Sequence, residues 1–304
     1  MAPPPAQPSH PSPPITPWGF TDDRGHRVTA DRPPQRLVAY VQAAATLEDL
    51  GVRVHGVFGS LHDGDAPDPA TSASLPAERL TWYGAGEGFR VEELLAAGPD
   101  LLVTVTYDEK SLYALPPAVT GRIEERIPCL ALSVAPGREV DAVRARFREL
   151  ATGLGATGEP GLAELAAARE RVRRAAAGSR ARVLALSSAG PGTVHLARPE
   201  AWPELRALAA LGVRLPAPPQ GPGANWATTA WPEATALHPD VVLADARAHA
   251  APAAQLTGPP GTRMAAAVLP WNPEPPASAP AHARFLDTVA AALEAHAAAA
   301  GRTR

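Results

Sequence analysis

A motif of helix, turn and strand occurs twice in this chain, and it limits the folds that the chain can adopt. The first copy, residues 91–104, reads as a short helix that ends at Gly98 because Pro99 cannot continue it, followed by an apolar strand. The second copy, residues 232–245, again leads a helix through a Pro-Asp turn into an apolar run. Neither strand alternates apolar with polar residues, which is typical of strands covered on both faces. Two copies so far apart predict two similar α/β lobes.

The segments around each copy predict parallel sheets. Strands and helices alternate along both halves, an order that places a helix between successive parallel strands. The predicted fold class is therefore α/β, with two Rossmann-like lobes of mainly parallel sheets joined by a long connecting helix. Apolar strands are expected at residues 36–40, 52–58, 101–104, 127–134, 182–186, 194–196, 241–245 and 268–269.

Composition and pattern together predict the domain boundaries. Residues 1–17 are rich in proline and are expected to be disordered or polyproline-like. The N-terminal lobe is predicted over residues 18–155 and the C-terminal lobe over residues 181–304. The connecting helix is predicted within residues 156–180, where one face is mostly Ala and Leu and the other is charged, as on a solvated surface.

Composition also excludes several classes of function. The net charge is −3 and no long basic run is present, so neither nucleic acid nor an anionic membrane is an expected partner. No stretch reaches the roughly 18 apolar residues of a membrane span. Cys129 is the only cysteine, which excludes a disulfide within the chain, and its apolar setting predicts an inert core thiol. Phosphate-binding and nucleophile motifs are absent, so we expect a protein that is not an enzyme, and we expect a monomer.

Several pieces follow one another along the chain: Asp22-Asp23-Arg24-Gly25, residues 92–103, Ile127-Pro128, the helix between the lobes, and residues 233–243. Taken in this order, they resemble the class III substrate-binding proteins of ABC importers, which capture ferric siderophores, cobalamin and haem. The resemblance covers roughly residues 18–298. Two further pieces resemble the branch that binds hydroxamate siderophores: Trp226-Ala-Thr-Thr-Ala, and Leu269-Pro-Trp271 before the last helix.

The resemblance implies an ABC permease as partner and a location outside the cytoplasm at the cell surface. It also implies that Glu92 and Glu233 dock onto arginines of the permease. Glu233 precedes its proline by six residues and Glu92 precedes its own by seven, so the two side chains can point differently. For Glu92 the alternative is simple stabilisation of a helix N-terminus. The sequence also lacks an export signal and a lipid-modified cysteine, so a cytoplasmic location is the alternative expectation.

Aromatic residues mark the expected ligand site. In open parallel sheets, ligands bind beyond the carboxyl ends of the strands, and a large amphipathic chelate needs broad apolar walls with a few polar tips. Each Trp could instead close the edge of a lobe; the pattern favours a ligand role for Trp226 and Trp271 and leaves Trp82, Tyr107 and Trp202 open. The candidates at strand ends and in loops are Tyr40, Trp82, Tyr107, Trp202, Trp226, Arg247 and Trp271.

Histidines are too scattered to predict a metal site built by the protein. A bare metal ion needs about three to four converging ligands, and no close-spaced histidine pair occurs. Neither a resident metal nor a covalent cofactor is therefore expected, and iron would arrive inside its chelator, a ferric siderophore or a related molecule. Two alternatives stay open on the same fold: a cytoplasmic carrier that sequesters a chelate, and an enzyme acting on a small molecule in the same cleft.

Overall fold

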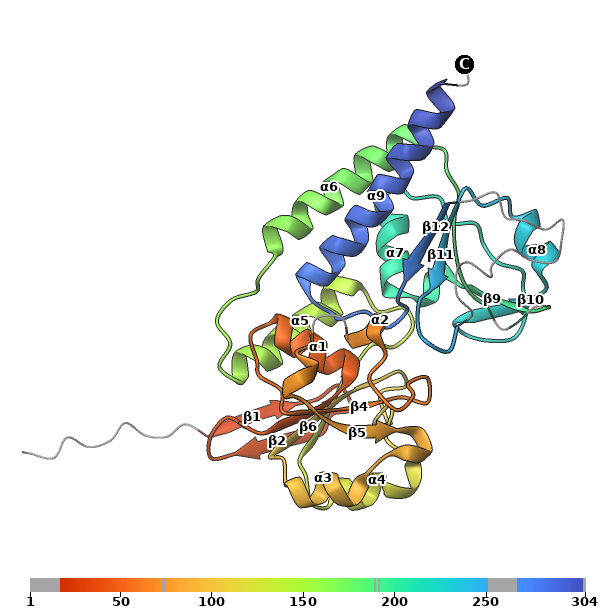
Figure 1. Ribbon diagram of the computed structural model, residues 1–304. Coiled ribbons are helices and arrows are strands. Elements are labelled where there is room, and N and C mark those ends of the chain that lie inside the picture. The colour runs from red at the N-terminus through yellow and green to blue at the C-terminus, as the bar shows by residue number, and fades with distance from the viewer. Residues whose placement is uncertain (1–16, 73–74, 189, 191, 251–266, 303–304) are drawn as a thin grey trace, which may run out of the picture.

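The computed structural model describes residues 17–72, 75–188, 190, 192–250 and 267–302, and it shows two α/β lobes (Figure 1). All but the last residue of the Pro-rich segment 1–17 lie outside the described residues. One apolar core fills the first lobe, and the two faces of the second lobe's sheet carry a core each. In the described part of the chain, no helix is both long enough and apolar enough to cross a membrane.

The first lobe holds a five-stranded sheet in the order β5-β4-β3-β6-β7, with every pair parallel. Helices α1 and α5 pack together on one side of this sheet, and α3 and α4 pack together on the other (Figure 1). The elements are β3 (Leu37–Tyr40), α1 (Val41–Asp49), β4 (Gly56–Gly59), α2 (Pro69–Ser72), β5 (Thr81–Ala85), α3 (Val91–Ala97), β6 (Leu101–Thr106), α4 (Pro117–Glu124), β7 (Cys129–Ser133) and α5 (Val140–Gly153).

A small hairpin of β1 (Trp18–Thr21) and β2 (Arg27–Ala30) covers the open edge at β7. Its turn supplies two carboxylates: Asp22 accepts a hydrogen bond from the Ala131 backbone N–H (3.0 Å), and Asp23 accepts one from Ser133 (2.7 Å). Unpaired strand edges otherwise present N–H groups for unwanted pairing. The Asp-Asp pair of the hairpin turn therefore accepts hydrogen bonds from the edge strand β7. Cys129 of β7 is buried, and burial raises the pKa of its thiol to about 12.

The second lobe holds a five-stranded sheet in the order β10-β9-β8-β11-β12. Strands β8, β11 and β12 are parallel, whereas β9 and β10 form an antiparallel edge. Residues 226–229 are not among the strands expected from the sequence; they form β10, which pairs with β9. The elements are β8 (Val183–Ser188), β9 (Val194–Ala197), α7 (Pro203–Ala210), β10 (Trp226–Thr229), α8 (Trp231–Ala236), β11 (Val241–Asp245), β12 (Ala267–Trp271) and α9 (Ala279–Arg302).

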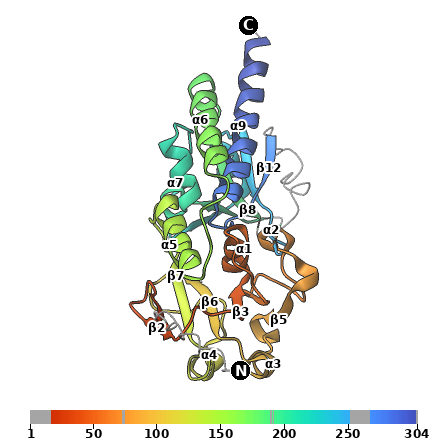
Figure 2. The same cartoon turned by 90° about the vertical axis from the view of Figure 1, so that its left-hand side faces the viewer.

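The chain connects the two lobes in two places. After α5, which packs on β1 and β7 of the first lobe, α6 (Leu162–Gly178) lies along α9 of the second lobe (Figures 1 and 2). Residues 272–278 form the second connection by contact alone: they leave β12, run against α1 of the first lobe and lead back into α9 of the second. In this connection the Gln42 amide donates to the Pro275 carbonyl (3.0 Å), and the Ala277 N–H donates to the Thr46 hydroxyl (2.8 Å). Two connections held in this way favour a small hinge movement over a wide one.

Each copy of the repeated motif forms the same structure. The first helix ends at Gly98 (φ 55°), and in the second copy His238 takes the left-handed position (φ 48°). The following aspartate then receives backbone N–H groups at the start of the neighbouring strand: Asp100 from Gln35 and Arg36 (both 2.8 Å), and Asp240 from Arg182 (2.8 Å). The Pro-Asp pair therefore ends one element and fixes the beginning of another.

Candidate functional site: a ligand cleft between the lobes

A cleft of about 1210 Å³ lies between the lobes and is lined by side chains from both. This volume exceeds the roughly 300–1,000 Å³ of common small-molecule pockets, so the cleft suits a large ligand. Tyr107 and Tyr113 from the loop after β6, together with His62, form the N-lobe wall. The C-lobe wall contains Ser187, Ser188, His195, Trp202, Asn225, Trp226, Thr228, Arg247 and His249, and Glu274 comes from the connection 272–278.

Three tryptophans cluster on the C-lobe side of the cleft. Trp202 and Trp226 line the cleft, and their ring centroids are 5.1 Å apart with the planes inclined by 62°. The Trp202 indole N–H donates to the Asn225 carbonyl (3.0 Å), which fixes the orientation of its ring. Trp271 lies behind both rings, with centroid distances of 5.6 Å to Trp202 and 5.9 Å to Trp226. This arrangement gives the wall a rigid aromatic surface.

Glu274 accepts hydrogen bonds from three tyrosines of the opposite lobe. Tyr107 and Tyr113 donate to Oε1 and Tyr40 donates to Oε2, each at 3.0 Å. The Arg247 guanidinium lies 3.5 Å from Oε2, so the buried carboxylate also faces a positive charge. Burial and the negative charge of Glu274 raise the pKa of Tyr107 well above its ordinary value, and the same causes raise that of Tyr113. Both phenols therefore remain neutral donors.

Arg247 is already paired inside the protein. Its guanidinium makes two hydrogen bonds with the carboxylate of Asp245, from Nε (3.0 Å) and from Nη2 (2.8 Å). Burial opposes the charge of Arg247, but the hydrogen bonds and the charges of Asp245 and Glu274 outweigh it and raise the pKa of the guanidinium. The pKa of the partner carboxylate is lowered. Burial raises the pKa of Asp245, but hydrogen bonds from Arg247 outweigh this effect. Arg247 therefore keeps its positive charge, and the carboxylate of Asp245 balances that charge within the protein.

The two lobes also touch at the rim of the cleft. The rings of His62 and His249 stack with centroids 4.4 Å apart and planes inclined by 29°. Beside them, the Asp68 carboxylate of the first lobe accepts the backbone N–H of Ala248 in the second. These contacts join residues 60–72 to the loop that follows β11.

The structure brings four of the seven predicted ligand residues to the cleft: Tyr107, Trp202, Trp226 and Arg247. Tyr40 is fully buried beneath the cleft and contributes only its hydroxyl to Glu274. Trp82 lies in β5 and lines a separate shallow hollow with Asp63 and Arg90. The expectation that Trp271 faces the ligand needs correction, because its side chain is 1% exposed and packs in the lobe core.

Sequence reasoning missed several cleft residues, among them Tyr113, Glu274, His62 and His195. Glu274 follows β12 by three residues, so the rule that ligands bind beyond the carboxyl ends of strands could have found it. Tyr113 gave no such signal, because it reaches the cleft through a turn in which its N–H donates back to the Val105 carbonyl (3.0 Å). His62 and His195 belong to different lobes, so they reach one cleft only because of how the two lobes are placed relative to each other.

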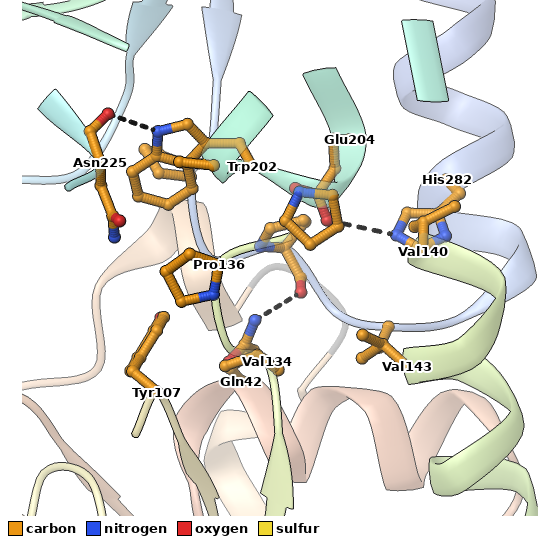
Figure 3. A pocket seen from close by; sticks show the side chains of 15 residues that line it. Gln42, Tyr107, Val134, Pro136, Val140, Val143, Trp202, Glu204, Asn225 and His282 are labelled. Atoms are coloured by element: carbon orange, nitrogen blue, oxygen red, sulfur yellow. Dashed lines mark hydrogen bonds and ion pairs between the residues drawn. The ribbon is translucent and has the colours of Figure 1, made fainter. Parts of the chain in front are cut away.

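A second, small cavity lies behind the cleft, where Gln42, Trp202 and the pair Glu204–His282 meet (Figure 3). Its volume is about 20 Å³, which is room for a single water molecule. The side-chain amide oxygen of Gln42 and both ring nitrogens of His282 are buried without a hydrogen-bond partner in the protein. Such groups are commonly satisfied by one buried water, so this cavity has the size and chemistry of a hydration site.

Glu92 and Glu233 both lie outside the cleft lining, on the first turns of α3 and α8. The Glu92 side chain is 75% exposed and forms an ion pair with Arg122 at 2.7 Å. Glu233 is exposed as well. Their helices lie on the outer sides of the two lobes (Figure 1). Within the described parts of the chain, no three His, Cys, Asp or Glu side chains converge in a way that could hold a metal ion.

Comparison with solved structures shows the family. DesE, a ferric-siderophore receptor protein from Streptomyces coelicolor, is 30% identical and superposes with a TM-score of 0.83 over 91% of this chain and 98% of its own. This chain belongs to the siderophore- and haem-binding group of ABC-importer substrate-binding proteins, the class III family. Members of this family bind their substrates and do not transform them, so the expectation that the chain is not an enzyme is confirmed.

More distant structures share the fold. The siderophore periplasmic binding protein from the fuscachelin gene cluster of Thermobifida fusca is 19% identical, with a TM-score of 0.58 over 86% of this chain and 97% of its own. The periplasmic haem-binding protein RhuT from Roseiflexus sp. RS-1 is 20% identical, with a TM-score of 0.61 over 87% of this chain and 99% of its own. No protein-family model and no curated protein matches the chain. The predicted two-lobed α/β fold is confirmed.

Proposed function

We propose that this protein captures a ferric hydroxamate siderophore in the inter-lobe cleft and delivers it to the permease of an ABC importer. The observation that carries the proposal is the cleft itself: about 1210 Å³, aromatic on both walls, with its arginine already paired. The family relationship to a ferric-siderophore receptor favours this function over a cytoplasmic carrier or an enzyme. The two periplasmic relatives favour a location outside the cytoplasm.

Charge favours a hydroxamate over a catecholate chelate. Three hydroxamates, each of charge −1, neutralise Fe³⁺, whereas three catecholates of charge −2 leave a complex of charge −3. Among the described residues that line the cleft, Arg247 is the only permanent cation, and it faces Asp245 and Glu274. A trianion would enter without a free counter-charge and would lose its hydration. A neutral tris-hydroxamate complex avoids this cost.

The tyrosines argue against haem as the ligand. Ferric haem is often held by an axial tyrosinate or histidine. Here the hydroxyl groups of Tyr107 and Tyr113 donate hydrogen bonds to Glu274, and their raised pKa values favour the neutral phenol. Ligation by either one would break a buried hydrogen bond and require loss of a tightly held proton. His62 and His249, in turn, are stacked on each other at the rim.

In this proposal, Glu92 and Glu233 are the residues that dock onto the permease. Each is an exposed carboxylate on the outside of a different lobe, so both can meet a partner while the ligand stays enclosed. Exposed charges of this kind mainly accelerate association and select the partner. The ion pair between Glu92 and Arg122 is solvent-exposed and contributes little to stability, so an arginine of the permease can replace Arg122 at small cost.

A titration followed by tryptophan fluorescence tests the ligand class. Three ferric complexes are compared at one salt concentration: a linear tris-hydroxamate, a tris-catecholate and haem. We expect saturable quenching by the hydroxamate complex, because Trp202 and Trp226 lie in the cleft wall, and much weaker binding of the other two. The iron-free hydroxamate serves as control for the contribution of the metal complex. Preferential binding of haem or of the catecholate complex would reject the proposal.

A further inference from the structure

We infer that Glu274 sets the charge preference of the cleft, so that the protein discriminates against chelates that carry a net negative charge. The inference rests on the proposed function and deepens it, because it assigns specificity to one residue rather than to the aromatic walls. Glu274 is a specificity determinant that acts on the ligand through space, and it also positions the tyrosines of the N-lobe wall.

The location of Glu274 is the first argument. Its carboxylate is 4% exposed, yet the residue lines the cleft, so its field reaches a bound ligand with little screening by water. It leaves the C-lobe sheet on the connection 272–278 and points at side chains of the N-lobe. A ligand that enters between the lobes therefore has this charge at the base of its site.

The charge balance around Glu274 is the second argument. Two carboxylates, Glu274 and Asp245, face one guanidinium, Arg247, which leaves an excess of one negative charge. The three phenols are neutral hydrogen-bond donors and do not cancel it. Within the described residues, the rest of the lining is aromatic, small or uncharged polar, apart from three histidines. The balance thus disfavours a negative ligand and tolerates a neutral or positive one.

The hydrogen bonds explain why a carboxylate persists at this buried position. A buried ionised carboxylate is costly unless it is paired and hydrogen-bonded. Glu274 receives three hydroxyl donors at 3.0 Å, its own backbone N–H donates to the side chain of Asn272 (2.8 Å), and the Arg247 charge lies within 3.5 Å. The hydroxyl donors and the guanidinium provide partners for both carboxylate oxygens, and the backbone hydrogen bond holds this part of the connection in place. A glutamine would keep the shape and an acceptor oxygen while removing the charge.

The test uses three ligands that differ by one charge at a time. Ferric desferrioxamine B carries a pendant ammonium group; N-acetylation makes the complex neutral, and N-succinylation makes it anionic. Dissociation constants are measured for the wild type and Glu274→Gln. The expected result is a shift of about tenfold in the ratio of anionic to neutral affinity and of about a hundredfold in the ratio of anionic to cationic affinity. Both shifts favour the anion, as estimated for unit charges about 8 Å apart at an effective dielectric constant of about 30.

Matched variants separate charge from structure. Glu204→Gln changes another buried carboxylate of the second lobe, outside the cleft lining, and should leave the ratio unchanged. Arg247→Met removes the cation and should shift the ratio in the opposite direction, which keeps the inference testable if Glu274→Gln does not fold. A purely structural role for Glu274 would weaken all three ligands equally, and an unchanged ratio would overturn the inference. Failure of the wild type to bind even the neutral complex would instead reject the proposed function, and the inference with it.

Discussion

The indole of Trp271 lies behind that of Trp226, with ring centroids 5.9 Å apart and ring planes inclined by 59°. The two residues have similar positions in the sheet of the second lobe: Trp226 begins β10 and Trp271 ends β12, and these are its two edge strands. They differ in exposure: Trp226 lines the cleft, and Trp271 is buried among core side chains. One indole is therefore available to a ligand, and the other supports it.

Substitution should separate these two roles. Trp226→Ala should weaken binding of the ferric hydroxamate about tenfold, through loss of roughly 1–2 kcal/mol of aromatic contact, and change stability little. Trp271→Ala should lower the free energy of unfolding by about 3–5 kcal/mol, because it leaves a cavity in the core. Fluorescence titration and denaturant unfolding of both variants measure the two effects. Unchanged affinity in the Trp226 variant would contradict its placement in the ligand wall.

Charge reversal at the outer helices should affect transport and leave ligand affinity unchanged. Glu92→Arg and Glu233→Arg each replace an exposed carboxylate that lies outside the cleft lining, so the dissociation constant for the chelate should stay the same. Association with the permease should slow, and the difference should diminish at high salt because the charges are screened. Glu170→Arg, on the exposed face of α6, is the matched control.

The docking prediction is checked by measuring chelate affinity and uptake on the same variants. Reduced chelate affinity in a folded Glu92 variant would place that residue in ligand binding instead. Normal uptake after both reversals would favour a carrier that engages no permease.

Ligand binding should weaken at acidic pH through His249, whose ring stacks on that of His62. Burial, followed by the positive charge of Arg247 and the nearby His62, lowers the pKa of His249; Asp245 and Glu274 oppose this shift. A lowered pKa means that His249 binds fewer protons in the folded protein, where the two rings stack, than in the unfolded chain. The contact is therefore fully stable above the ordinary histidine pKa of about 6.5 and loses stability as the pH falls below it.

Affinity measured between about pH 8 and about pH 5.5 checks this pH dependence. The wild type should lose affinity several-fold over this range. His249→Phe retains a ring that can stack on His62 but cannot be protonated, so it should show a flatter profile. His26→Phe, on the exposed hairpin turn, is the control and should behave as the wild type. A profile of the His249 variant identical to that of the wild type would assign the pH dependence to another group.

The sequence predicted those parts of the molecule that depend on local patterns. The turns at Gly98-Pro99 and Pro239-Asp240 are local, and they were sufficient to predict two lobes of similar construction. The cluster around Glu274 was not predictable, because its three phenols come from strand ends and a turn of the other lobe, 161 to 234 residues away in the chain. Burial of Trp271 was missed for a related reason: a strand end can face a cleft or a core, and only packing decides which.

The two motif aspartates should differ in their contribution to stability, in proportion to the hydrogen bonds that they accept. Asp100 receives two backbone N–H groups and Asp240 receives one, all at 2.8 Å. Asp100→Ala should therefore lower the free energy of unfolding by about 2 kcal/mol and Asp240→Ala by about 1 kcal/mol. Asn retains a single acceptor oxygen, so Asp240→Asn should be close to wild type, whereas Asp100→Asn should lie between the alanine variant and the wild type. Denaturant unfolding of the four variants checks this order. Equal losses for the two alanine variants would show that the motif stabilises the lobes through its turn and not through the carboxylate.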